Sequence, residues 1–264
     1  MTRQPLHLLA GFILLFLSAP GSHAGSQNPT SPEAGFLARS YHSPTGETMS
    51  YRLFVPPSYD ASKKYPLVLW LHGAAGRGSD NLLQISTGNF LGTHVWTTPK
   101  NQAKFPAFVL APQVSDTKMW ARPHANTPPV SIRLALEILD SVEKDYAIDP
   151  ARVYVAGQSM GGEGTFMVLA TAPGRFAAAI PLCGYGEPWM IERVVKVPVW
   201  IFQCQADEIV HVEHAREWVA ALQKAGGAPK YTEYPGVGHN VWEKAFAELD
   251  LVPWLAAQRR APTR

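Results

Sequence analysis

A serine, an aspartate and a histidine at separate points of the sequence have the types and settings of a nucleophilic catalytic site. Ser159 lies in the run Gly157-Gln-Ser-Met-Gly161, which fits the pattern G-x-S-x-G between an apolar run and a helical pattern. Glycines two positions either side of the serine let the chain turn sharply, so that the hydroxyl projects above a sheet edge. The alternative interpretation is a glycine-rich turn whose serine only caps the following helix.

A serine hydroxyl is a weak nucleophile and needs a base that a third group orients. His239 is the favoured base, because it lies on a glycine-containing turn after the last strand-like run, residues 231–234. Asp207 is the favoured acid, since it follows the apolar run 199–203 after a tight turn. Its neighbour Glu208 is the competing candidate.

Two backbone amides are expected to stabilise the negative charge that develops on a substrate carbonyl. One belongs to Met160, which begins the helical pattern after the serine. The other belongs to the run of small residues from His72 to Gly78, where the contact is assigned to Ala74 and Ala75 stays open. His72 is expected to support this loop, with a role as a second base as the alternative.

Short apolar runs alternate with helical patterns over most of the chain. Expected strands are residues 51–55, 67–71, 108–111, 153–156, 178–182, 199–203 and 231–234, and expected helices are residues 132–146, 162–171 and 214–225. Strands that are apolar on both faces and alternate with helices indicate an α/β fold: a mainly parallel central sheet covered by helices on both faces. Only residues 184–198 separate two of the strands next to the site, so no large lid domain fits there.

The composition is that of one globular domain, with 264 residues of which 46% are hydrophobic and 17% charged. The formal net charge is +2, and like charges form no long run, which argues against a nucleic-acid partner. We expect a catalytic domain over residues 36–258, preceded by a flexible leader over 25–35 and followed by a C-terminal tail over 259–264.

The first residues have the layout of an export signal. Arg3 precedes the apolar run Leu8 to Ala19, and the small-x-small triplet Ser22-His-Ala24 follows it. The apolar run is shorter than the roughly 20 residues that cross a bilayer, so we expect a signal peptide over residues 1–24 rather than a membrane span. Cleavage near Ala24 would leave a secreted or periplasmic protein. There, Cys183 and Cys204 could form a disulfide or remain two buried thiols.

With these residues in place, the chain resembles the α/β-hydrolase superfamily. Within it, the chain is similar to secreted esterases and depolymerases related to feruloyl esterases and polyhydroxybutyrate depolymerases, a group that includes predicted peptidases. The likeness is carried by Leu71 to Asn81, Ala111-Pro-Gln113 with Trp120, Gly157 to Gly162 with Gly164 and Thr165, Asp207 to Val210, and Gly238-His239 with Trp242. The chain order serine, aspartate, histidine also fits. The resemblance implies the triad Ser159, Asp207 and His239, no metal and no organic cofactor.

Two positions depart from the family pattern. Gln203-Cys204 stands where many relatives have His-Gly, and Glu163 stands where many have an aromatic residue. Neither change touches the triad, but both weaken any transfer of substrate preference.

We therefore expect a secreted serine hydrolase that cleaves small-molecule or polymeric carboxylic esters through an acyl-enzyme intermediate, with feruloyl-type and polyester substrates as candidates. The tryptophans Trp120, Trp189 and Trp242, and also Trp96, could stack on an aromatic or sugar-bearing substrate, or could simply pack loops against the domain. The alternatives are a serine peptidase with the same triad, and a non-catalytic protein that binds carbohydrate or polyester.

Overall fold

The computed structural model of the protein describes residues 33–122, 124 and 126–260. The expected signal peptide lies outside these residues, as do residues 25–32 of the expected leader and residues 261–264 of the expected tail. The described residues start with a turn in which the Phe36 amide donates to the Glu33 carbonyl over 3.0 Å, and the first described strand starts at Phe36.

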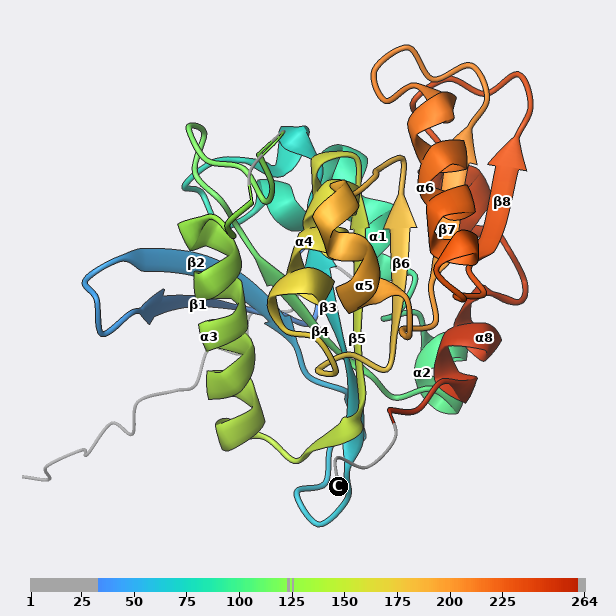
Figure 1. Cartoon of the computed structure of the whole chain (residues 1–264). Coiled ribbons are helices and arrows are strands. Elements are labelled where there is room, and N and C mark those ends of the chain that lie inside the picture. Colours follow the sequence, from blue (N-terminus) through green and yellow to red (C-terminus); the bar gives the residue numbers. More distant parts are fainter. Residues whose placement is uncertain (1–32, 123, 125, 261–264) are drawn as a thin grey trace, which may run out of the picture.

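Eight strands form one sheet in the order β1-β2-β4-β3-β5-β6-β7-β8 (Figure 1). The strands are β1 (Phe36–His42), β2 (Thr48–Phe54), β3 (Tyr65–Leu71), β4 (Phe108–Pro112), β5 (Ile148–Gln158), β6 (Ala178–Leu182), β7 (Trp200–Cys204) and β8 (Lys230–Tyr234). The pairs β1–β2 and β2–β4 are antiparallel, and the remaining pairs are parallel. The predicted mainly parallel sheet is therefore confirmed.

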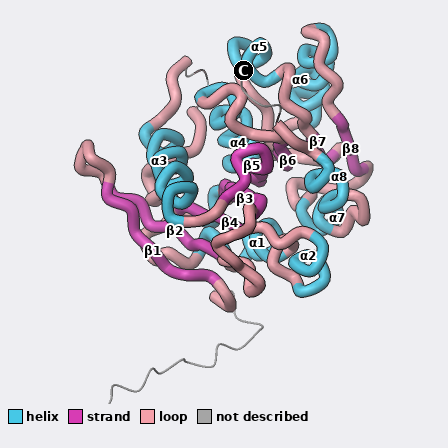
Figure 2. Tube along the Cα trace, turned by 90° about the horizontal axis from the view of Figure 1, so that it is seen from below, coloured by secondary structure: helices cyan, strands magenta, loops and turns pink. Residues whose placement is uncertain are grey.

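Helices cover both faces of this sheet (Figure 2). They are α1 (Phe90–His94), α2 (Pro99–Lys104), α3 (Val130–Asp145), α4 (Met160–Thr171), α5 (Ile191–Val194), α6 (Val212–Lys224), α7 (Trp242–Phe246) and α8 (Leu251–Ala257). The helices α3, α4, α5 and α6 lie on one face, and α1, α2, α7 and α8 on the other.

The core divides into two clusters because successive side chains of a strand point to opposite faces. In β3, for example, Leu67, Leu69 and Leu71 belong to the cluster beneath α3 and α4. Val68 and Trp70 belong to the cluster on the opposite face, which also contains Leu255 of α8. Every residue of β3 is buried, as expected for a central strand with a helical layer on each side.

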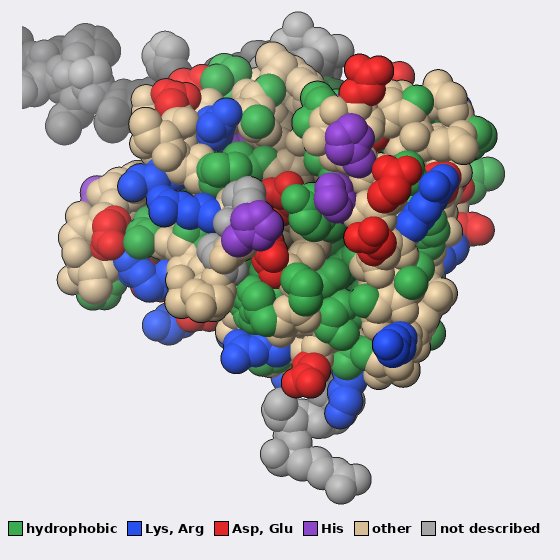
Figure 3. All heavy atoms as spheres, turned by 45° about the horizontal axis from the view of Figure 1, so that its top comes forward, with side chains coloured by type: hydrophobic (Ala, Val, Ile, Leu, Met, Phe, Trp, Pro, Cys, Tyr) green, Lys and Arg blue, Asp and Glu red, His purple; other side chains and the backbone are tan. Residues whose placement is uncertain are grey.

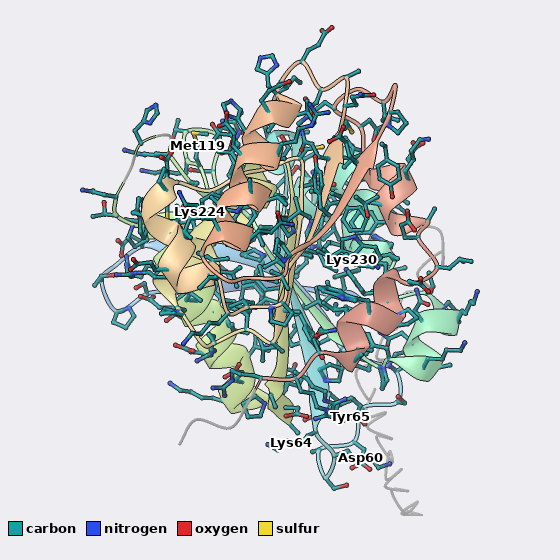
Figure 4. All side chains as sticks on the ribbon, turned by 45° about the vertical axis from the view of Figure 1, so that its right-hand side comes forward. Asp60, Lys64, Tyr65, Met119, Lys224 and Lys230 are labelled. Carbon is teal, nitrogen blue, oxygen red and sulfur yellow. The ribbon has the colours of Figure 1, made fainter. Side chains whose placement is uncertain are left out.

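The parallel strands end at one edge of the sheet, and the loops at this carboxyl edge contain the residues of interest. Figure 4 shows Lys64 and Tyr65, where β3 begins, near the bottom of the molecule, and Met119, in the loop after β4, near the top. Between β6 and β7 the chain forms only a single turn at Pro188–Met190 and the short helix α5. The prediction that the fold has no large lid is confirmed.

Within the described ranges, we find no helix whose length and apolar character would suffice to span a bilayer.

Candidate active site

Ser159 occupies the sharp turn between β5 and α4. Its backbone is in a strained region, with φ 54° and ψ −120°, and its amide donates to the Leu182 carbonyl of β6 over 2.8 Å. The flanking glycines are required by close backbone packing. A Cβ at Gly161 would lie 1.9 Å from the Leu71 carbonyl oxygen, and one at Gly157 would lie 2.3 Å from the Gly161 oxygen.

The three residues predicted from separate parts of the sequence lie in hydrogen-bond contact. His239 Nε2 is 2.8 Å from Ser159 Oγ. His239 Nδ1 is 2.8 Å from Asp207 Oδ2 and 3.0 Å from Oδ1. The competing acid, Glu208, is exposed on the same turn. A hydroxyl, an imidazole and a carboxylate in this order form the arrangement that activates a serine as a nucleophile.

Asp207 is held as a carboxylate by its surroundings. Burial by itself would raise the pKa of Asp207, since only 4% of the residue is exposed. The amide of Val210, the imidazole of His239 and the amide of Ile209 all bond to the carboxylate, and together they bring its pKa below the ordinary value. The residue next to His239 is therefore charged at neutral pH and can stabilise an imidazolium.

The loop after β3 lies against the end of β5 just before Ser159, since a Cβ at Gly73 would lie 3.4 Å from the Gln158 carbonyl oxygen. The amide of Gly73 is engaged, because it donates to Asn89 Oδ1 over 2.8 Å. Among the residues that the structure describes, no hydrogen bond from the amides of Ala74, Ala75 or Met160 to a protein acceptor is present. These amides are the groups that remain available for an oxyanion.

His72 supports this loop from below, as predicted. It is fully buried, and its Nε2 accepts a hydrogen bond of 3.1 Å from the Val114 amide. The hydrogen must therefore be on Nδ1, which lies 2.7 Å from the Gly73 carbonyl oxygen and donates to it. Burial lowers the pKa of His72 to about 4, so the ring is neutral and its nitrogens are occupied. This leaves it no capacity to act as a base.

Three buried amide side chains near the site make loop-supporting hydrogen bonds that were not predicted. Asn89 holds the Gly73 amide, Gln113 Nε2 donates to the Gly76 carbonyl over 3.1 Å, and Gln203 Nε2 donates to the Val210 carbonyl over 2.7 Å. Their hydrogen-bond partners are distant in the sequence or lie across a loop. In the sequence, Gln113 stands out only as part of a family motif and Gln203 only as a departure from the family pattern, and Asn89 has no signal of its own.

Both cysteines are free thiols beneath the triad. The sulfurs of Cys183 and Cys204 are 3.8 Å apart, and both residues are fully buried. The neighbouring thiol and burial raise the pKa of Cys183, so it is protonated at neutral pH. Cys183, Asp207 and His239 each place a potential metal ligand within 4.8 Å of the others. However, the imidazole already bonds to the carboxylate and the serine, which fits a proton relay better than a metal site.

The tryptophans predicted to bind substrate differ in their exposure. Trp120 is fully buried and its indole donates to the His72 carbonyl over 3.0 Å, so the prediction that it stacks on a substrate is wrong. Trp96 is likewise buried and donates to the Gly92 carbonyl. Both pack their loops against the domain. Trp242 is half-buried, with its ring perpendicular to that of His239 at 5.6 Å between centroids, and Trp189 is half-buried beneath Arg193.

A narrow crevice lies beside the first turn of α4. Its cavity of about 20 Å³ is lined by Glu163, Tyr185 and Glu187, among others. Burial, and then the charge of Glu187, raise the pKa of Glu163 to about 7. Figure 3 turns this end of the molecule toward the viewer and shows histidine and acidic side chains close together on the surface.

This geometry agrees with comparisons to known proteins. A family model described as Esterase matches residues 43–220, a span that includes Ser159 and Asp207. The chain belongs to the Esterase family. That family lies within the α/β-hydrolase superfamily, so the resemblance inferred from the sequence motifs is confirmed.

Relatives of this esterase-family chain include two curated proteins. It is 28% identical to the "Probable feruloyl esterase C" of Aspergillus niger over 171 residues, which are 65% of this chain and 58% of that protein. It is 30% identical to the poly(3-hydroxyalkanoate) depolymerase C of Paucimonas lemoignei over 126 residues, which are 45% of this chain and 28% of that one. The chain spans from 24% to 58% of the length of the curated relatives it matches.

Solved structures show the same similarity. A thermostable esterase superposes with a TM-score of 0.82 at 37% identity, covering 86% of this chain and 64% of that one. A ferulic acid esterase superposes with a TM-score of 0.64 at 17% identity, covering 83% of this chain and 98% of that one, and shares the fold.

Proposed function

We propose that this protein is a carboxylic-ester hydrolase that acts through an acyl-enzyme intermediate on Ser159. The observation that carries the proposal is the continuous chain of contacts from Asp207 through His239 to Ser159, with 2.8 Å on each side of the imidazole. Membership of the Esterase family supports the choice of an ester as the substrate.

The reaction begins when His239 Nε2 accepts the proton of Ser159 Oγ and the oxygen attacks the ester carbonyl. The amides of Ala74 and Met160 hold the oxyanion of the tetrahedral intermediate. The intermediate collapses to the acyl-enzyme, and the His239 imidazolium returns its proton to the departing alcohol. Water, deprotonated by the same imidazole, then cleaves the acyl-enzyme and releases the carboxylic acid, with the proton returning to Ser159.

Three further parts of the proposal concern the location of the enzyme, its substrates and the residues that contact them. The predicted signal peptide over residues 1–24 makes the enzyme secreted or periplasmic, and the "Uncharacterized secreted protein" among its relatives is consistent with this. The named activities of its relatives favour aromatic feruloyl-type esters or polyesters as substrates. Trp189 and Trp242, which are partly exposed, are the candidates for contact with such substrates.

The test compares purified wild-type protein with Ser159→Ala on short p-nitrophenyl esters, methyl ferulate, a hydroxyalkanoate oligomer and a peptide anilide. We expect ester hydrolysis to fall by about 10⁴-fold or more in the variant. A fluorophosphonate should label the wild type on Ser159 and leave the variant unlabelled. Hydrolysis that persists undiminished in Ser159→Ala would overturn the mechanism. Faster cleavage of the anilide than of the esters would favour the peptidase, and binding without turnover would favour a non-catalytic role.

A further inference from the structure

The loop that carries Asp207 is held firmly at only one end by its backbone. Leaving β7, the amide of Gln205 donates to the Tyr234 carbonyl and the amide of Ala206 to the Val237 carbonyl, each over 3.0 Å. Beyond Asp207 the chain turns outward, and 71% of Ile209 is exposed. The second half of the loop therefore needs another attachment if Asp207 is to keep its orientation.

The side chain of Gln203 provides that attachment. Gln203 belongs to β7 and is fully buried, and its Nε2 donates to the Val210 carbonyl over 2.7 Å. The amide of the same residue, Val210, donates to Asp207 Oδ1 over 2.9 Å. Val210 thus accepts a hydrogen bond from β7 through its carbonyl and donates one to the Asp207 carboxylate through its amide.

The other half of the Gln203 carboxamide makes no hydrogen bond within the described chain, as in Gln84, Gln102 and Gln158. Its Oε1 is buried and has no hydrogen-bond partner among the described residues. A buried polar atom without a partner destabilises a protein, whereas an apolar side chain of the same shape would incur no such cost. Packing alone therefore does not explain a glutamine here, while the need for its N–H donor does.

We propose that Gln203 is a positioning residue for the acid of the triad. Its carboxamide ties Val210 to β7, which keeps the Val210 amide on Asp207 Oδ1 and leaves Oδ2 directed at His239 Nδ1. Gln203 acts through Val210 and Asp207. This inference rests on the proposed function, because it assigns Gln203 to the same triad.

The test uses two substitutions of Gln203 in the full chain, with a short p-nitrophenyl ester as substrate. Gln203→Met keeps the shape but removes the donor, and we expect kcat to fall by about 10- to 100-fold while KM changes little. The acidic limb of the kcat/KM profile should move to lower pH, because a displaced carboxylate stabilises the imidazolium less. Gln203→His places a ring N–H at a similar reach and should restore most of the activity and the pH profile.

A matched control separates positioning from simple loss of stability. Gln102 in α2 also donates from its Nε2, to the carbonyls of Trp96 and Ala107, and its Oε1 is likewise buried without a partner in the described chain. Helix α2 lies away from the upper end of β7 (Figure 1). Gln102→Met should lower the melting temperature but leave kcat and the pH profile unchanged.

The outcomes separate this inference from the proposed function. If Gln203→Met and Gln102→Met behave alike in kcat and pH profile, Gln203 is not a positioning residue, although a loss of activity in Ser159→Ala still supports the triad. If Gln203→Met does not fold, Gln203→Asn serves instead. Its amide falls one methylene short of Val210, so it should show the same loss of kcat, and wild-type kcat in a folded Gln203→Asn would overturn the inference.

Discussion

The two flanks of Ser159 are built in different ways. On the side of β3, the loop that presents Ala74 is braced by the neutral buried side chains of His72 and Asn89. On the side of β7 and β8, the turns carry the buried, charged Asp207 and the partly exposed imidazole of His239. Donors that stabilise an oxyanion must stay fixed, whereas groups that exchange protons need access to water and to substrate.

The two histidines express this difference most directly. His72 is fully buried, and burial lowers its pKa to about 4, so it remains a neutral brace throughout the physiological range. The side chain of His239 is 18% exposed and lies between a hydroxyl and a carboxylate. The same side chain therefore serves as a fixed support in one flank and as a proton carrier in the other, and the surroundings determine which.

The largest expected effect comes from the charged flank. Asp207→Asn removes the charge that stabilises the imidazolium and allows the wrong tautomer of His239, so we expect kcat to fall by about 10⁴-fold. The control is Glu208→Gln on the exposed neighbouring position, which should keep kcat within about twofold. Steady-state kinetics on a short p-nitrophenyl ester measures both. Equal losses in the two variants would show that the acid has been misassigned.

A smaller effect is expected from the neutral flank. His72→Phe keeps a ring in place but leaves the Val114 amide and the Gly73 carbonyl without their partner. We expect kcat to fall by about 10- to 100-fold as Ala74 shifts, and the free energy of unfolding to fall by about 2–4 kcal/mol. In contrast to Gln203→Met, the acidic limb of the pH profile should not move. His42→Phe, at an exposed position in β1, is the control. A shift of the acidic limb of the pH profile in His72→Phe would contradict the division between the two flanks.

The triad residues could be predicted from the sequence, whereas the residues that hold them in position could not. Ser159 could be predicted because a G-x-S-x-G pattern between a strand and a helix is a local signature. Asp207 and His239 could be predicted because the ends of parallel strands converge at one edge of a sheet. The braces Asn89 and Gln203 depend on partners that only the folded chain brings within reach, and no local pattern encodes such contacts.

The same reasoning explains what was missed or wrong in the fold. The central strands were predictable because both of their faces are apolar, but β1 is largely exposed along its length and gives no such signal. The short helices α7 and α8 have too few residues for a clear helical period. Trp120 was misinterpreted because a tryptophan in a polar loop can pack inward or face a substrate, and composition does not distinguish these outcomes.

The smallest expected effect concerns Glu163, which lies in the first turn of α4 between the two flanks and has no hydrogen-bond partner in the described chain that would offset its burial. Its pKa is raised to about 7 in the folded protein, above the ordinary value of 4.5, so the native state holds a proton that the unfolded chain releases. The free energy of unfolding should therefore decrease as pH rises between about 4.5 and 7 and stay level above that range. Glu163→Gln removes this dependence.

Urea unfolding of wild type and Glu163→Gln between pH 4.5 and 8 measures the effect. The two proteins should be similar at the acidic end, and at pH 8 the variant should be more stable by about 1–2 kcal/mol. Glu192→Gln, an exposed position in α5, should follow the wild type throughout. Parallel curves for wild type and Glu163→Gln would mean that Glu163 is already ionised at acidic pH. In that case the Glu163 carboxylate would be charged at every working pH, one helical turn from Ser159. The charged flank at β7 and β8 would then extend across the first turn of α4.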